Sequence, residues 1–267
     1  MDKITLFCIT WKNLSITKDR INMKLVSRRL IALLSIFGLS QVWAQSMPEG
    51  NLNEVFQCSI KPGFTFEQVL EVGRAIERGP DGPSLVFYRQ PIVASSDRVG
   101  TINVVRYWDN FEHMNKGLEA TQNTASAASH WLTMVDCGGN RRVGINRNIE
   151  SSQSSAYEGG TLDSTLVSIR GCQIAEGHSA QDVYSGLLNF DQSNRQAGDS
   201  SGYGFLQMIM GGNGSKGSEI AIRTIGENPA GLARRLDAIT HTAATPEMFS
   251  TCGDVSLWRS HVAHWGI

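Results

Sequence analysis

Four of the five cysteines occur at spacings that repeat along the chain. Cys58 and Cys137 lie 79 positions apart, and Cys172 and Cys252 lie 80 positions apart. The residues around them repeat as well, because an Ile, a Gly and a hydroxyl residue follow Cys58 and Cys172 at the same distances, and a Gly follows both Cys137 and Cys252. The sequence therefore predicts a tandem duplication in which each copy keeps one cysteine pair.

Residues 23–44 have the three parts of a secretory signal peptide. A basic segment at 23–29 precedes an apolar run at 30–39, and Ala44 supplies the small residue that signal peptidases require. We expect cleavage between Ala44 and Gln45, which predicts a secreted or periplasmic protein. The apolar run is about half of the ~20 residues that a membrane-spanning helix needs, and no span is expected in the mature chain.

Residues 1–22 precede a complete signal peptide and are interpreted as a mis-assigned N-terminal extension, which also removes Cys8 from the fold. Residues 1–44 hold 7 of the 24 basic residues and 2 of the 25 acidic ones, so the mature chain carries a net charge of −6. Nucleic-acid binding needs a basic surface, and a nucleic-acid partner is therefore not expected.

The four remaining cysteines are expected to form disulfides, because an exported protein matures in an oxidising compartment. Four cysteines allow three pairings. The repeat favours Cys58 with Cys137 and Cys172 with Cys252, since each copy should keep its ancestral bond. No C-x-x-C spacing suggests a metal or redox site instead.

Each copy reads as strand, helix, strand, strand, helix, strand. The first copy (residues 45–150) has strands expected at 55–60, 85–93 and 101–108, a helix opened by a capping box at Thr65, a second helix capped by Asp109, and a strand around Cys137. A Ser- and Gly-rich linker at 151–163 leads to the second copy, residues 164–267, which follows the same order.

This order is that of a ferredoxin-like βαββαβ unit, in which the first and last strands are neighbours. The fold class is therefore α+β, with two tandem units that bury their open sheet faces against each other. The arrangement resembles the dimeric α/β-barrel superfamily, including antibiotic-biosynthesis monooxygenases and NIPSNAP-like proteins. The resemblance implies one intramolecular α/β barrel around a central space.

The first strand of each copy predicts which side chains face that space. Phe56 and Cys58 should face the helices, which leaves Gln57 and Ser59, and in the second copy Gly171 and Gln173, pointing inward. We expect Gln57, Ser59 and Gln173, with Trp108 at the rim, to line a site for a small apolar or amphipathic ligand. A core filled by side chains is the alternative.

Trp108 and His113 are the candidate catalytic residues, because a strand that ends in Trp and leads into a helix with His resembles the corresponding segment of small monooxygenases. That resemblance implies a cofactor-independent monooxygenase or a haem-handling enzyme. The Asn expected in the first strand is missing, and Ile225 stands where the first copy has Trp108. No other cofactor is indicated.

No other motif indicates catalysis. The G-x-S-x-G pattern at 198–202 follows a helix and precedes a strand, the reverse of a nucleophile elbow. His261 and His264, in an expected frayed tail, lack further metal ligands nearby. The leading interpretation is a small-ligand-binding barrel protein, with an enzyme and a structural or partner-binding protein as the alternatives.

Overall fold

The computed structural model describes residues 46–98, 100–123, 126–138, 141–149, 164–198, 201–211, 217–226, 229–241 and 249–266. They belong to one compact unit, residues 45–267. The elements of this part of the chain are, in order, β1 (Asn51–Ile60), α2 (Phe66–Ala75), β2 (Leu85–Val93), η1 (Ser96–Arg98), β3 (Thr101–Trp108), α3 (Phe111–Asn123), α4 (Ser126–Met134), β4 (Val135–Asp136), β5 (Arg141–Asn148), β6 (Ser164–Ile174), α5 (Ala180–Gln196), β7 (Gly202–Met210), β8 (Glu219–Ile225), α6 (Pro229–His241) and β9 (Ser250–Trp265). The predicted α+β class is confirmed, whereas the expected linker at 151–163 lies outside the described residues.

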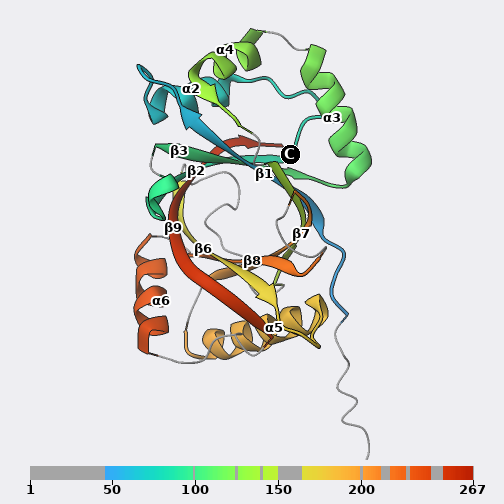
Figure 1. Cartoon of the computed structure of the whole chain (residues 1–267), viewed down its shortest axis with the longest axis vertical. Helices are drawn as coiled ribbons and strands as arrows, with labels where there is room; N and C mark the ends of the chain where they lie inside the picture. Colours follow the sequence, from blue (N-terminus) through green and yellow to red (C-terminus); the bar gives the residue numbers. More distant parts are fainter. Residues whose placement is uncertain are drawn as a thin grey trace, which may run out of the picture. The chain divides into compact units, whose positions relative to one another are not determined.

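The strands form one antiparallel sheet that closes on itself. Eight strands follow each other in the order β3-β2-β9-β6-β8-β7-β5-β1, and pairing between β1 and β3 completes the ring, while the short β4 is attached beside β1. Figure 1 looks into this ring, with α2, α3 and α4 on one side of it and α5 and α6 on the other. An eight-stranded barrel has an interior just wide enough for packed side chains or one small ligand.

Each half of the chain supplies four neighbouring strands of the ring. The first half contributes β2-β3-β1-β5 and the second contributes β7-β8-β6-β9. The halves are joined where β2 pairs with β9 and where β5 pairs with β7. Because both junctions are paired, neither half keeps a long exposed strand edge that could recruit another chain.

Both predicted disulfides are present. Cys58 of β1 is bonded to Cys137, which follows β4, and Cys172 of β6 is bonded to Cys252 of β9. The Cα atoms lie 4.0 Å apart in each pair. The second bond ties the first strand of its half to the last one, whereas the first bond ties β1 to the segment between β4 and β5. The strand expected around Cys137 is therefore misplaced, because β4 ends at Asp136 and β5 supplies the fourth barrel strand of the first half.

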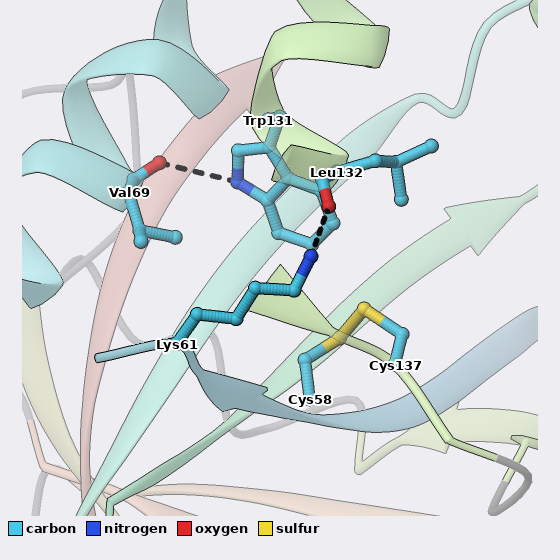
Figure 2. The surroundings of a disulfide bond; sticks show 6 residues. All are labelled: Cys58, Lys61, Val69, Trp131, Leu132 and Cys137. Atoms are coloured by element: carbon cyan, nitrogen blue, oxygen red, sulfur yellow. Dashed lines mark hydrogen bonds between the residues drawn. A yellow bond between two sulfur atoms is a disulfide. The ribbon is translucent and has the colours of Figure 1, made fainter. Parts of the chain in front are cut away.

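The first disulfide lies in the apolar core beneath α2 and α4. Cys58 is fully buried there, and the Trp131 indole nitrogen donates a hydrogen bond of 3.2 Å to the carbonyl of Val69 (Figure 2). At the edge of this core the ammonium of Lys61 donates to the carbonyl of Leu132 at 3.1 Å. These contacts hold α2 and α4 together above β1.

Two helix starts carry the side chains that the sequence predicts. Thr65 accepts a hydrogen bond from the backbone of Gln68, whose side chain accepts one from the Thr65 backbone, and this capping box opens α2. Ser179 and Asp182 form the equivalent box at the start of α5. Each box satisfies two backbone N–H groups that a helix start leaves unpaired.

The end of the chain differs from the expected frayed tail. β9 continues to Trp265, so His261 and His264 are strand residues that lie opposite Tyr88 and Val86 of β2. Pairing with β2 explains the difference, because this strand gives the end of the chain a partner that lies far away in the sequence. Within the described ranges no cluster of three or more His, Cys, Asp or Glu could hold a metal ion.

Candidate functional site in the barrel interior

A cavity of about 690 Å³ lies inside the ring. It is lined by residues from both halves of the chain, including Asn53 of β1, Arg89 of β2, Asn103 of β3, Ile169 of β6 and Arg223 of β8. Cavities of roughly 300–1,000 Å³ with mixed apolar and polar walls are typical of small-molecule sites. The barrel interior thus offers enough space for a small organic molecule.

The remainder of the barrel interior is filled by a second core. Phe87, Val105 and Tyr107 are buried there and pack with Val262 and Trp265. The rings of Phe87 and Tyr107 meet edge to face, with centroids 5.8 Å apart. The sequence left two interpretations of the barrel interior, a ligand pocket and a core filled by side chains. Each of them describes one part of the interior.

Only some of the residues predicted to line the site lie in the cavity wall. Gln57 and Gly171 line the cavity. Ser59 and Gln173 lie on the same faces of β1 and β6 as Gln57 and Gly171, but both are exposed. They are not among the described lining residues, because β1 and β6 extend beyond the cavity. Gln173 instead accepts a hydrogen bond of 3.2 Å from Ser218.

Trp108 lies on the outer face of the sheet, away from the cavity. Its side chain is 1% exposed, and its indole nitrogen donates a hydrogen bond of 3.2 Å to the carboxylate of Glu54. His113 does lie beside it, with the two rings edge to face and their centroids 5.4 Å apart. The structure therefore brings the two candidate catalytic residues together, but neither is among the described residues of the cavity wall.

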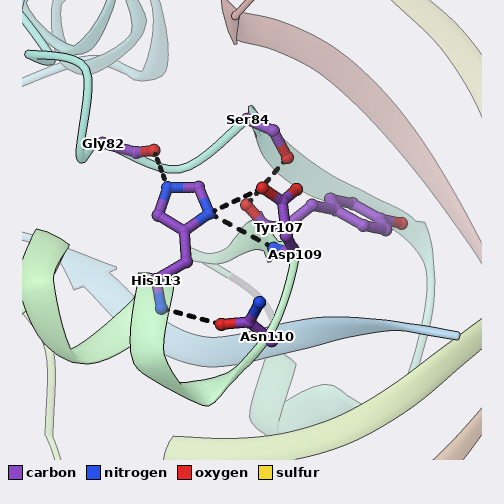
Figure 3. A network of polar contacts seen from close by, with 6 residues as sticks. All are labelled: Gly82, Ser84, Tyr107, Asp109, Asn110 and His113. Carbon is purple, nitrogen blue, oxygen red and sulfur yellow. Dashed lines mark hydrogen bonds and ion pairs between the residues drawn. The ribbon is translucent and has the colours of Figure 1, made fainter.

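His113 fixes the start of α3. Its Nε2 lies 2.8 Å from the carbonyl of Gly82, and its Nδ1 lies 3.1 Å from the Asp109 carboxylate (Figure 3). The helix cap is Asn110, whose side chain accepts a hydrogen bond of 2.9 Å from the His113 backbone. The prediction that Asp109 caps this helix is wrong, because Asp109 lies one residue too early and contacts the imidazole instead.

Haem is the cofactor that the resemblance implies, and the described residues do not fit it in this cavity. Haem iron is commonly held by His, Cys or Tyr, or by Met together with His. The described lining contains no His, Cys or Tyr, and its Met208 therefore has no His in the cavity wall to complete a Met/His pair. Both ring nitrogens of His113 already have partners. No axial ligand is therefore assigned, and haem stays a prediction from the resemblance.

A polar cluster that the sequence did not reveal surrounds Arg223, a residue of the cavity wall. The Arg223 guanidinium contacts the Tyr107 hydroxyl and donates hydrogen bonds to the side chains of Asn148 at 3.1 Å and Asn146 at 3.3 Å. Gly204 of β7 permits this placement, because a side chain there would collide with the guanidinium. Side chains alternate between the two faces of a strand, and this alternation places Arg223 of β8 on the inner face of the barrel. Alternation is the one signal in the sequence that could have pointed to Arg223.

We expect Tyr107 to ionise at lower pH than Tyr88. Burial alone raises its pKa, but Arg223 and Arg89 outweigh burial and hold the pKa of Tyr107 below its ordinary value of 10.0. Burial raises the pKa of Tyr88. In an ultraviolet-absorbance titration a phenolate that forms below pH 10.0 should therefore be lost in Tyr107→Phe and shifted to higher pH in Arg223→Gln.

The sign of the linked stability follows from this shift. Between the lowered pKa of Tyr107 and about 10 the unfolded chain binds more protons than the folded protein, so stability should rise with pH relative to Tyr107→Phe. The contribution is lost as pH falls through the lowered pKa. Phenolate formation below pH 10.0 that is unchanged in Tyr107→Phe would contradict this assignment.

Comparison with known proteins supports the fold. No protein-family profile and no curated protein sequence matches the chain. Among solved structures, a chlorite dismutase variant from Candidatus Nitrospira defluvii covers 81% of this chain and 94% of its own, with 10% sequence identity and a TM-score of 0.50. At that identity the likeness concerns the fold alone.

Two further structures are less similar. They are an anthrone oxidase-like protein (9% identity, 83% of this chain and 93% of that one, TM-score 0.47) and a heme-binding protein from Thermus thermophilus (9% identity, 80% and 92%, TM-score 0.45). The resemblance to NIPSNAP-like proteins in particular stays a prediction. In the part of the chain that the structure describes, no helix combines the length and apolar character needed to cross a bilayer.

Proposed function

We propose that this protein binds a small, partly apolar ligand inside its barrel. The observation that carries the proposal is the cavity of about 690 Å³, whose wall combines apolar side chains such as Leu206 and Met208 with polar ones such as Asn53 and Arg223. A wall of this kind orients a ligand through a few polar contacts while apolar contacts supply much of the affinity.

Two parts of the proposal concern the origin and location of the chain. The shared strand order of the two halves and the equivalent positions of the two disulfides support a tandem duplication of a ferredoxin-like unit. The same disulfides support export after cleavage near Ala44, because such bonds persist in oxidising compartments. Each half would then supply part of one shared ligand site.

An enzymatic role through Trp108 and His113 is less well supported than ligand binding. The structural neighbours include a chlorite dismutase, which fits a monooxygenase or haem-handling protein at the level of fold. In this chain, however, Trp108 is buried against Glu54, and both imidazole nitrogens of His113 have partners. Any chemistry in the barrel would have to use other residues.

A cavity-filling substitution tests the proposal. Gly171 lines the cavity, and a Cβ placed on it meets no atom within 4 Å, so Gly171→Leu should fill the space without disturbing the sheet. We expect the neutral fluorescent probe N-phenylnaphthylamine to bind the wild-type protein and to lose at least about tenfold in affinity in Gly171→Leu, through steric exclusion from the site.

Gln173→Leu is the matched control, because it adds the same side chain two residues along the same strand, outside the described cavity wall. This variant should bind the probe like the wild type. A wild-type protein that does not bind the probe, or equal binding by Gly171→Leu, would overturn the proposed function.

A further inference from the structure

Two buried hydrogen-bond donors on the cavity wall have no acceptor in the described part of the chain. They are the side-chain nitrogen of Asn53, a residue only 2% exposed, and Nε of Arg223. Asn53 lies opposite Tyr107 in the β1–β3 pair, and the Tyr107 hydroxyl contacts Arg223. Both donors therefore belong to one patch. A buried donor without a partner is costly, so this patch is suited to a ligand that brings acceptors.

The charge of the cavity wall points to the kind of acceptor. Four arginines, Arg89, Arg98, Arg142 and Arg223, line the cavity, whereas its described carboxylates are those of Glu219 and Asp254. The Arg142 guanidinium is neutralised by Glu219 at 2.7 Å.

Arg223 differs from Arg142 in its partners. It forms no ion pair with the described carboxylates, and its hydrogen bonds go to neutral groups of Tyr107, Asn146 and Asn148. A cationic group that is partly desolvated and lacks a counter-charge favours an anion beside it. The lowered pKa of Tyr107 reports the same positive potential.

The rim of the cavity has the opposite character. Val93 and Val255 line it and are 59% and 39% exposed, and Arg98 lies over the ring of Trp258 at 5.9 Å. The two donors without an acceptor thus lie in the buried part of the cavity, and its exposed part offers apolar side chains beside the polar Ser95, Arg98 and Asp254. A ligand that matches both has a charged head and an apolar body.

We infer that the ligand is an organic anion whose carboxylate or similar oxyanion accepts hydrogen bonds from Arg223 and Asn53. Its apolar body extends past Leu206 and Met208 toward Val93 and Val255. This inference rests on the proposed function, because it names the chemical class of the molecule that occupies the same cavity. Arg223 supplies the charge, and Asn53 supplies a directional donor that selects a planar or tetrahedral oxyanion over a halide.

A matched pair of probes tests the inference on the full chain. N-phenylnaphthylamine and anilinonaphthalene sulfonate share their aromatic rings and differ by one sulfonate. We expect the anionic probe to bind the wild-type protein at least about tenfold more tightly than the neutral one, since a hydrogen bond to a charged group contributes at this level. Arg223→Gln should abolish that difference while it keeps the affinity for the neutral probe.

Arg259→Gln is the control for net charge, because Arg259 is exposed on β9, is not among the described lining residues and loses the same single charge. It should keep the preference for the anion. Asn53→Ala should reduce the preference in part. Retained binding of the neutral probe shows that each variant still has its cavity.

The outcomes separate this inference from the proposed function. If the neutral probe binds and the anionic one binds no better, the anion assignment is wrong and the ligand site stands. If neither probe binds, the proposed function itself fails. A preference for the anion that survives Arg223→Gln would also overturn the inference, because the charge would then come from elsewhere.

Discussion

Replacing Cys58 and Cys137 together by alanine is expected to lower the free energy of unfolding by about 2–5 kcal/mol. The disulfide closes a loop with a sequence separation of 79, and the chain-entropy model assigns about 4 kcal/mol to loops of this length. Cys58 is also fully buried in the core beneath α2 and α4, so its sulfur contributes packing that alanine cannot replace. Equilibrium unfolding in guanidinium chloride measures the loss.

The second disulfide provides the comparison. Cys172→Ala with Cys252→Ala removes a bond of separation 80, so its loop term is nearly the same. Cys172 is 4% exposed, and the packing loss should also be similar. Reduction of both disulfides in the wild-type protein should lower its free energy of unfolding by about the sum of the two losses. Stability that is unchanged by both double substitutions and by reduction would show that the bonds do not constrain the chain.

Glu54→Gln should destabilise the protein by about 1.5–3 kcal/mol, the range for hydrogen bonds to charged groups, because the carboxylate is buried while the Arg141 and Arg106 side chains are 49% and 26% exposed. Glu54 is fully buried on the helix-facing side of β1. Its carboxylate forms ion pairs with Arg141 and Arg106 and accepts a hydrogen bond from the Trp108 indole. The glutamine side chain keeps the shape and loses the charge, which leaves two guanidinium groups without a counter-charge.

Glu112→Gln is the matched control for Glu54→Gln. Glu112 forms an ion pair of 2.7 Å with Lys116 on the exposed face of α3. Water solvates both partners there, so this substitution should leave the unfolding midpoint unchanged. Equal effects of the two substitutions in thermal and chemical unfolding would contradict a special role of the buried carboxylate.

The disulfides and most of the elements could be predicted, but β5 was missed, because the last strand of the first copy was expected around Cys137 and not at 141–148. β-branched and aromatic residues are frequent in β2 and β3, and the capping boxes at Thr65 and Ser179 mark two helix starts. The cysteine repeat then favoured one pairing. The extension of β9 to Trp265 was missed, because it depends on pairing with β2 across the two halves.

The site was harder to predict. Alternation along a strand tells whether a side chain points into or out of the barrel, but not how far along the barrel it lies. Gln57 lines the cavity while Ser59, on the same face of β1, is exposed. Trp108 and His113 resembled a catalytic pair, but Glu54 and Gly82, distant in the sequence, occupy their polar atoms. Such contacts follow from the register of β1, β2 and β3, which local sequence does not specify.

The most direct test of the central claim is a crystal structure of the purified protein grown with anilinonaphthalene sulfonate. The account predicts electron density for the probe inside the barrel, with its sulfonate within hydrogen-bond distance of Arg223 and Asn53 and its rings toward Val93 and Val255. Density only on the outer surface, or an interior filled by side chains that leave no space for the probe, would contradict a ligand site in the barrel.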